Sequence, residues 1–448
     1  MKTLFLTVIS VLLCSLLLAE TSITIFNENF ATVRTKLQLD LKKGVNEYRF
    51  TDIPTYIKPT SVKLNPIKKT DKIIIYSQNY EYDLANTNKV LDKYLDKNIE
   101  LIVKKGDVFS GILKAFDSNS VMIQKSGSDE IFIINKEEMQ NINLAKMPEN
   151  FYTKPTLRWL LYSDKSGKRE VELNYITDNI KWDAQYVAQL NKDDNAIDLS
   201  SWISLDNRSG KRYEDVKLKL MAGAPHLVRE KPVYARDIMP LSAKGMPEEF
   251  GVTEKEFYEY YLYTVKQTVS INNNQQKQIS LFDPTNVIVE KVFTYNCNPK
   301  GDINTSIKFV NSEKNGLGIP LPKGLVRIFK RDAEDDVEFI GEDEITHSPK
   351  DEEIELKVGV AFDVKGEFTV LHTERISKRA RKEEYQVELR NHKDKDITIE
   401  VTKRLGRDWE ITNASDDYEK KDAFTAKFIV KVKANQNKVI NFTVRFNY

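Results

Sequence analysis

An alternation of polar and apolar residues recurs along most of this chain and constrains its fold more than any other feature. The first clear case is Leu37, Leu39 and Leu41, which alternate with polar residues. Because successive side chains of a strand point to opposite faces, this pattern is typical of a strand with one buried face. It recurs at sandwich-like spacing in residues 157–163, 169–175, 180–190, 197–206 and 213–221. The expected fold class is all-β, with several antiparallel β-sandwiches and few short helices.

Residues 86–148 depart from this pattern. Apolar residues at helical spacing follow an Asn86-Thr87 cap, so a helix is expected over residues 86–97. Five short strands are expected after it, up to Ile142. This order resembles the small Sm-like or SH3-like barrel, and the residues that carry the likeness are Gly106, Gly111, Phe116 and Asp117. We interpret the segment as an insert used for packing or partner contact, because fold does not fix function.

The chain is long enough for several domains. Its 448 residues exceed the roughly 250–300 at which single hydrophobic cores stop growing. Residues 224–252 carry four prolines and no periodicity, which is typical of a long irregular connection. The expected division is a signal peptide at 1–19, an N-terminal β unit at 20–85, the helix and barrel-like insert at 86–148, a β-sandwich at 149–300 with the irregular loop 224–252, and a C-terminal β-sandwich at 301–448.

Local patterns in the middle of the chain give further expectations. Trp182, Tyr186 and Trp202 alternate with polar residues, so all three are expected to face a core. Residues 254–261 are expected to form a helical turn. Cys297 has no histidine near it in sequence, so we expect a packed thiol rather than a nucleophile.

The first residues have the form of an export signal. Lys2 precedes an apolar run from Leu4 to Leu18, and Ala19 is a small residue suited to cleavage. A run of about fifteen apolar residues is shorter than the roughly 20 needed to span a bilayer. Loss of this segment would remove Cys14 and leave Cys297 as the single cysteine, so an intrachain disulfide would be impossible. We therefore expect an exported protein that is periplasmic or associated with the envelope.

The balance of charges limits the class of partner. Lys and Arg total 68, Asp and Glu total 67, and the net charge is +1. Such a balance lacks the basic field that nucleic-acid binding requires. We expect a protein or polysaccharide partner in the envelope and no nucleic acid. Peripheral membrane association is a further expectation, and the oligomeric state is open.

The densest group of polar turn residues lies in residues 319–365, which alternate short strands with Gly, Pro and acidic turns. Asp343, His347 and Asp363 are its candidates for contact with a partner. His347 could serve as a ligand or a pH-sensitive hydrogen-bonding group, or it could satisfy backbone groups in a turn. The second reading is the expected one.

A basic cluster lies between two expected strands, and its members are Arg375, Lys378, Arg379, Arg381 and Lys382. Arg379 and Arg381 are its candidates for contact. The cluster could hold an anionic polysaccharide or a lipid headgroup. A solvated turn is the expected interpretation, because Glu383 and Glu384 dilute the charge.

The motifs of common enzymes are not met. The four histidines, at positions 226, 347, 372 and 392, lack the one-turn spacing of a zinc hydrolase. The acidic run 332–336 resembles a calcium loop, but Val337 stands where the turn requires glycine. We expect a solvated acidic hairpin there, assign no catalytic residue, and expect no metal or cofactor.

A further set of residues, spread over most of the chain, carries a resemblance to a known family. These residues are Phe26-Asn27, Val33-Arg34, 57–62, Trp182, Tyr186, Trp202, Asn207, Ser209-Gly210, Tyr213, Asp215-Val216, Ala222-Gly223, 321–327, 341–343, His347, 362–364 and 409–411. The chain resembles bacterial proteins that carry a mucoidy-inhibitor-type domain of unknown function. The resemblance implies a β-rich, exported protein with a loose association to exopolysaccharide phenotype. Many members carry a coiled coil where this chain has the barrel-like insert.

Three functional hypotheses follow. The first is a non-enzymatic envelope protein that acts as a scaffold or binding module. The second is a hydrolase of envelope glycans that uses carboxylates such as Asp343 and Asp363. The third is an outer-membrane β-barrel component, suggested by the alternation of Phe442, Val444 and Phe446 at the end of the chain.

Overall fold

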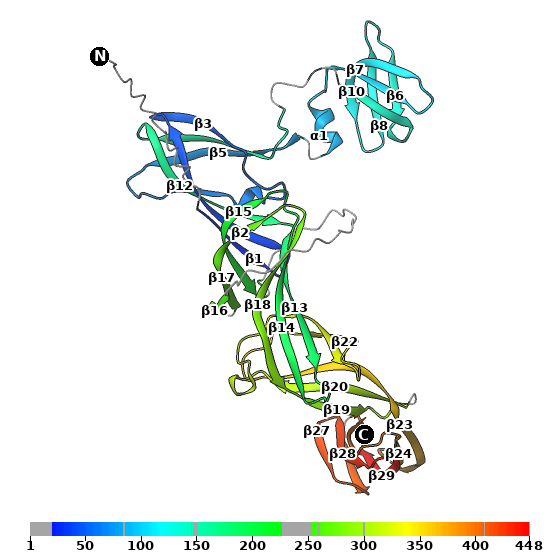
Figure 1. Cartoon of the computed structure of the whole chain (residues 1–448). Coiled ribbons are helices and arrows are strands. Elements are labelled where there is room, and N and C mark those ends of the chain that lie inside the picture. Colours follow the sequence, from blue (N-terminus) through cyan, green and yellow to red (C-terminus); the bar gives the residue numbers. More distant parts are fainter. Residues whose placement is uncertain are drawn as a thin grey trace, which may run out of the picture.

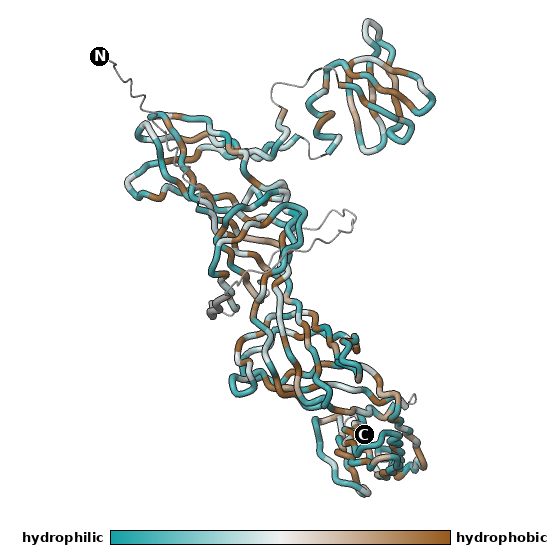
Figure 2. Tube along the Cα trace, in the orientation of Figure 1, coloured by the Kyte–Doolittle hydropathy of each residue, from teal (hydrophilic) through white to brown (hydrophobic). Residues whose placement is uncertain are grey.

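The computed structural model describes residues 20–83, 86–144, 146, 151–223, 225, 252–257, 260–298, 301–406 and 408–447. Figure 1 shows an elongated body of β-sheets with a small unit beside one end. Hydrophobic and hydrophilic residues alternate along many strands, as expected (Figure 2). The predicted all-β class is confirmed. Within the described residues, no helix is long and apolar enough to cross a membrane. The expected signal peptide and nearly all of the loop 224–252 lie outside these residues.

The N-terminal end of the body is a seven-stranded sheet that shares one core with a three-stranded sheet. Leu39, Trp159 and Leu173 are buried in that common core. In spatial order the larger sheet contains β16 (Val252–Phe257), β17 (Tyr260–Ile271), β15 (Tyr213–Ala222), β1 (Thr21–Phe26), β2 (Phe30–Leu41), β12 (Gly167–Asp178) and β4 (Lys63–Pro66). The smaller sheet contains β3 (Gly44–Phe50), β11 (Thr156–Ser163) and β5 (Ile73–Glu81). The predicted helical turn at 254–261 is wrong, because β16 pairs along β17.

A five-stranded sheet forms the middle of the body. Its strands are β18 (Gln275–Ile288), β14 (Ala196–Asn207), β13 (Ile180–Leu190), β21 (Gly324–Arg331) and β22 (Val337–Ile345). Trp182 and Tyr186 are buried as predicted, whereas Trp202 is 36% exposed. Trp202 points outward because the inward set of β14 includes Ser201 and Ile203, which lie on the opposite face.

The C-terminal end is one nine-stranded sheet that folds over itself. Its strands are β26 (Trp409–Ala414), β29 (Gln436–Asn447), β24 (Ala380–Asn391), β23 (Glu353–Ser377), β20 (Asp302–Val310), β19 (Glu290–Tyr295), β25 (Ile397–Arg404), β28 (Thr425–Val432) and β27 (Tyr418–Asp422). Phe428 of one layer contacts Phe442 of the other, with ring centres 4.9 Å apart. The indole Nε1 of Trp409 donates to the carbonyl of Ala423 at 2.9 Å and ties the two ends together.

Two strands from the segment 301–448 lie outside the nine-stranded sheet. Strand β21 runs parallel to β13, so residues 324–345 belong to the middle sheet. The sequence gives no local signal of this pairing, because the two strands are far apart in the chain.

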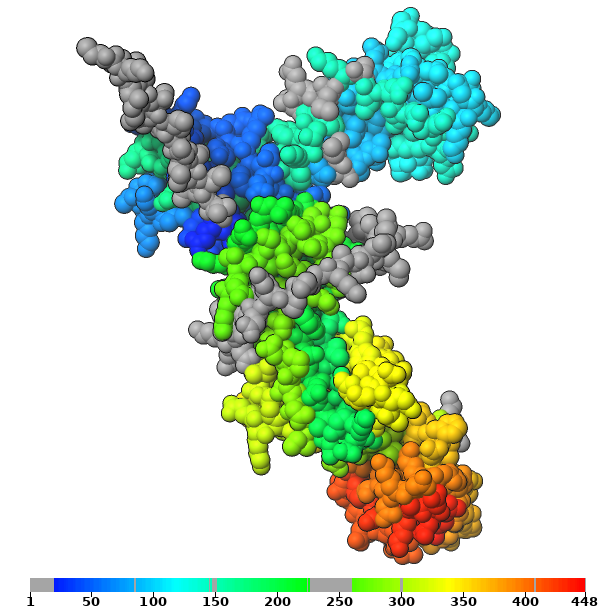
Figure 3. All heavy atoms as spheres, viewed as in Figure 1, coloured from blue at the N-terminus to red at the C-terminus, as the bar shows by residue number. Residues whose placement is uncertain are grey.

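The insert contains a helix followed by five strands, in the predicted order. Its elements are α1 (Thr87–Asp92), β6 (Asn98–Val103), β7 (Val108–Phe116), β8 (Ser120–Lys125), β9 (Ile131–Asn135) and β10 (Met139–Leu144). The Asn86 side chain accepts from the Lys89 N–H at 3.0 Å and caps the helix, which ends before the predicted residue 97. Figure 3 shows this unit (cyan) projecting from the body. Short 3₁₀ helices complete the described elements, at η1 (Pro59–Ser61), η3 (Lys136–Glu138) and η4 (Glu313–Asn315).

The strand order of the body contains an internal repeat. The strands of the first unit are, in spatial order, β18, β14, β13 together with β12, β2, β1, β15 and β17. The strands of the second unit are, in spatial order, β29, β24, β23, β20, β19, β25 and β28. The pair β12 and β13 corresponds to the single long strand β23. Each unit has one parallel pair, β1 with β15 and β19 with β25. The body therefore contains two copies of one arrangement, with β21 and β22 inserted in the second and with β3, β4, β5, β11, β16, β26 and β27 outside the repeat.

A buried asparagine occupies the same place in each unit. Asn207 ends β14 and Asn391 ends β24. The Nδ2 of Asn391 donates to the carbonyls of Lys395 at 2.9 Å and Lys433 at 3.0 Å, and its Oδ1 accepts from the Lys393 N–H at 3.0 Å. The partners of Asn207 at the matching places are the Lys211 and Asn272 carbonyls and the Ser209 N–H. Each carboxamide thus fastens two turns to the end of a strand.

The Asn391→Ala variant tests this fastening. It leaves buried carbonyl groups without a donor, so the free energy of unfolding should fall by about 2–3 kcal/mol. Asn391→Asp should cost at least as much, because a carboxylate would face those carbonyl oxygens. Urea unfolding measures both, with exposed Asn413→Ala as the matched control. Equal stability of Asn391→Ala and the control would contradict the role of Asn391.

Candidate functional site

Two buried tyrosines hold the segment 319–323 against the body. The Tyr186 hydroxyl donates to the carbonyl of Pro322 at 2.7 Å, and the Tyr263 hydroxyl donates to that of Pro320 at 2.9 Å. Burial raises the pKa of Tyr186 well above its ordinary value, so the phenol remains a donor. The proline-rich segment 319–323 is therefore packed against the body by these two hydrogen bonds.

Asp343 and His347 are engaged with backbone groups. The Asp343 carboxylate accepts from the Lys357 N–H at 2.8 Å through Oδ2 and from the Glu344 N–H at 2.9 Å through Oδ1. The Nδ1 of His347 accepts from the Lys323 N–H at 3.1 Å. Burial and the nearby Lys323 lower the pKa of His347, which favours the neutral ring as an acceptor. The prediction that His347 satisfies a backbone group is confirmed.

Asp363 lies apart from these two residues. Its Oδ2 is 3.4 Å from the Nζ of Lys393, in a half-exposed ion pair. Within the described part of the chain, Asp343, His347 and Asp363 form no hydrogen bond or ion pair with one another. The structure thus does not join them into one site, and the hydrolase alternative stays a prediction.

Arg379 and Arg381 lie at the hairpin between β23 and β24. The register places Arg375 directly opposite Arg381, and like charges in this position destabilise a strand pair. Arg381 has compensation, because its Nε is 3.0 Å from Glu383 and its guanidinium lies 4.8 Å from the centre of the Phe446 ring. Among the described residues, no carboxylate pairs with Arg375.

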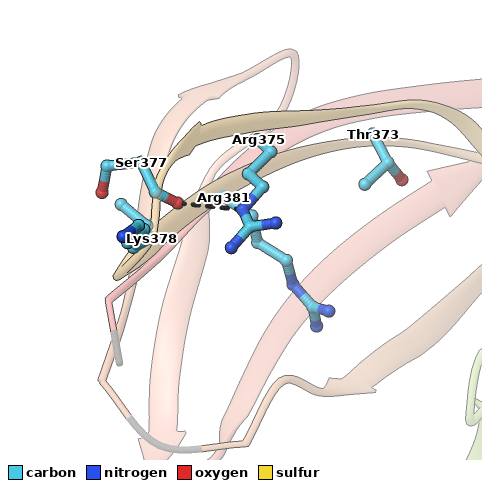
Figure 4. Close-up of a pocket in the computed structure, with 6 residues that line it drawn as sticks. Thr373, Arg375, Ser377, Lys378 and Arg381 are labelled. Carbon is cyan, nitrogen blue, oxygen red and sulfur yellow. Dashed lines mark hydrogen bonds between the residues drawn. The ribbon is translucent and has the colours of Figure 1, made fainter.

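Of the other hairpin cations, Lys382 pairs with the Glu384 carboxylate at 3.4 Å. Arg375, Lys378 and Arg379 form no ion pair within the described residues. The Arg375 Nε donates to the Ser377 carbonyl at 3.4 Å, and the Arg379 N–H donates to the Ser377 hydroxyl at 3.1 Å. Figure 4 shows Arg375 and Arg381 on the same side of the hairpin. They border a hollow of about 340 Å³, which is lined by Thr373, Arg375, Ser377, Lys378, Ala380 and Arg381.

A further cation lies deeper in the sandwich. The Nζ of Lys403 is 3.8 Å from the centre of the Phe368 ring and 5.4 Å from that of Tyr385. The Tyr385 hydroxyl donates to the Glu383 carboxylate. Burial lowers the pKa of Lys403, and the nearby Cys297 and Glu383 only partly offset this. The aromatic faces stabilise an ammonium group that has lost part of its hydration.

Cys297 is a packed thiol, as predicted. It is buried and free of any disulfide. Burial raises its pKa to about 12, so the thiol stays protonated and is a poor nucleophile at neutral pH.

Lys403 was missed in the sequence although a signal existed. It continues the inward positions of Ile397, Ile399 and Val401 in β25, where an apolar residue is expected. A charged residue at such a position indicates either a strand end or a polar contact inside the sheet.

The arrangement can bind an anion. Arg375, Lys378 and Arg379 offer donors that no carboxylate in the described part of the chain occupies, and Arg381 is held in place by Glu383 and Phe446. Guanidinium groups bind carboxylates and phosphates through paired hydrogen bonds. The hairpin is therefore the candidate functional site.

Lys403 gives a pH-dependent prediction. Its pKa is lower in the folded protein than in the unfolded chain, so the folded state binds fewer protons between the lowered pKa and the ordinary value of 10.5. Stability should therefore rise with pH through that window. Lys403→Met keeps an unbranched side chain against Phe368 and should abolish this rise. Urea unfolding of both proteins from neutral pH upward measures the difference.

An exposed lysine supplies the control for this experiment. Lys395→Met removes one ammonium group from a solvated turn, so its stability should follow the parent protein across the same pH range. If stability changed with pH in the same way in the parent and in Lys403→Met, the lowered pKa of Lys403 would be contradicted.

Comparison with known proteins assigns the larger part of the chain to a family. Residues 171–448 match the family described as Domain of unknown function (DUF4139). The N-terminal residues that carried the resemblance, such as Phe26-Asn27, lie outside the matched span. No curated protein matches the chain. Since the match covers more than half of its length, the protein belongs to the DUF4139 family.

Proposed function

We propose that this protein is an exported, non-enzymatic binding module of the bacterial cell envelope, and that it engages an anionic partner through the β23–β24 hairpin. The export signal expected in residues 1–19 and the resemblance to mucoidy-inhibitor-type proteins support the compartment. The partner is a protein or polysaccharide that carries carboxylate groups.

The observation that carries this proposal is the pair Arg375 and Arg381. Two arginines directly opposite each other cost stability in the isolated protein, and an anion between them would relieve that cost. The neighbouring Lys378 and Arg379 add charge at the turn. The elongated body of β-sheets (Figure 1) also supports the role of a scaffold.

A charge-neutralised hairpin tests the proposal. The triple variant Arg375→Gln, Lys378→Gln, Arg379→Gln should bind polyglutamate and a polyuronate about tenfold more weakly than the parent, equivalent to about 1.4 kcal/mol. Arg381 is left in place because it packs on Phe446. Binding of the parent should weaken as salt is raised, because exposed charges are screened. Isothermal titration calorimetry measures both effects.

Matched charges elsewhere supply the control. Lys104→Gln, Lys105→Gln, Lys154→Gln removes the same formal charge from exposed positions and should leave the affinity unchanged. Equal affinities of the hairpin variant and this control for both polymers would overturn the proposal.

A further inference from the structure

One edge of β23 is unpaired in the second unit although the matching edge of the first unit is covered. From Glu367 to Ser377, β23 pairs with β24 on one side, and no described strand pairs with its other side. In the first unit, β13 pairs with β14 on one side and with β21 on the other. The first unit therefore shows that an edge of this kind can pair with a further strand.

The registers of the two units identify the matching residues. Ile180 pairs with Asn207 in the first unit, and Val364 pairs with Asn391 in the second. By these registers, the stretch 184–190 that β21 covers corresponds to residues 368–375 of β23, in which Leu371 is an extra residue at a register shift. An equivalent backbone edge is thus filled in one unit and open in the other.

The covered hairpin in the first unit is also fastened by charge. Asp194, at the tip between β13 and β14, forms ion pairs with Lys330 of β21 and, at 2.9 Å, with Lys291. Burial would raise the pKa of Asp194, but hydrogen bonds from the two lysines outweigh it and lower the pKa. Here the tip is acidic and the covering strand is basic.

The open hairpin has the opposite charge. Its tip carries Arg375, Lys378 and Arg379, which have no carboxylate partner within the described residues. Residues 369–377 are all exposed, and three of them are large aliphatic residues: Val370, Leu371 and Ile376. An unpaired edge with exposed aliphatic side chains is a template for another strand.

We propose that the open edge of β23 binds an extended acidic segment of a partner protein, which adds a strand beside residues 367–377. This deepens the proposed function by naming the partner class at the same hairpin, and it rests on that function. Backbone hydrogen bonds would supply affinity, and acidic side chains would pair with the hairpin cations. Parallel pairing with the same edge of a second copy would bring two cationic tips together, which is unfavourable.

Backbone methylation tests strand addition directly. The probe is a short peptide of alternating valine and glutamate, made unmodified, methylated at every valine nitrogen, or methylated at every glutamate nitrogen. Alternate N–H groups of a strand point to opposite edges, so one methylated peptide should bind at least about tenfold more weakly while the other binds like the unmodified peptide. If both methylated peptides bind like the unmodified one, strand addition is overturned and charge alone accounts for binding.

Hydrogen exchange locates the bound peptide. Amides in residues 367–377 should exchange more slowly when the unmodified peptide is present, and Lys104→Gln, Lys105→Gln should behave like the parent. Protection confined to other strands would overturn the proposal. If neither polyglutamate nor the polyuronate binds the hairpin, the proposed function itself fails. If both polymers bind but the peptide protects nothing in β23, only the strand partner fails, and the polysaccharide becomes the favoured ligand.

Discussion

Buried carboxamide groups at the ends of strands are the interaction on which both units of the body depend. A turn that enters the core must satisfy its backbone carbonyl and N–H groups, since each one left unpaired costs about 1–3 kcal/mol. Asn207 and Asn391 each supply two donors and one acceptor to such turns. Asn311 does the same for the proline-rich segment, donating to Ile319 and Pro349. The sheets can change direction there without exposing the chain to water.

The two units differ mainly in how their strands are joined, and this difference produces the site. In the first unit the chain breaks at Asn179, where a positive φ of 60° separates β12 from β13 and divides the unit between two sheets. In the second unit β23 continues without a break through 25 residues. Residues 369–377 of this strand are all exposed, so the cationic hairpin faces solvent.

The alternation of residues predicted most of the strands, because burial on one face imposes a local period. It could not predict that β21 pairs with β13, or that Trp202 faces outward, because register is set by distant partners. The basic cluster was visible, but the opposition of Arg375 and Arg381 required the hairpin register. The repeat had a faint signal in Asn274-Gln275-Gln276-Lys277 and Asn435-Gln436-Asn437-Lys438, two turns that match in sequence and in positive φ at the asparagine.

A net charge of +1 conceals the separation of charges on which binding would rest. Elsewhere in the body, several lysines are matched by carboxylates on neighbouring strands, as Lys308 and Lys427 are by Glu400. Such pairs contribute little net stability, and they leave little field at a distance. At the hairpin, Glu383 is shared between Arg381 and Tyr385, so Arg375 and the turn cations keep their field. An unpaired edge and an unneutralised charge therefore coincide in one place, where a partner can satisfy both.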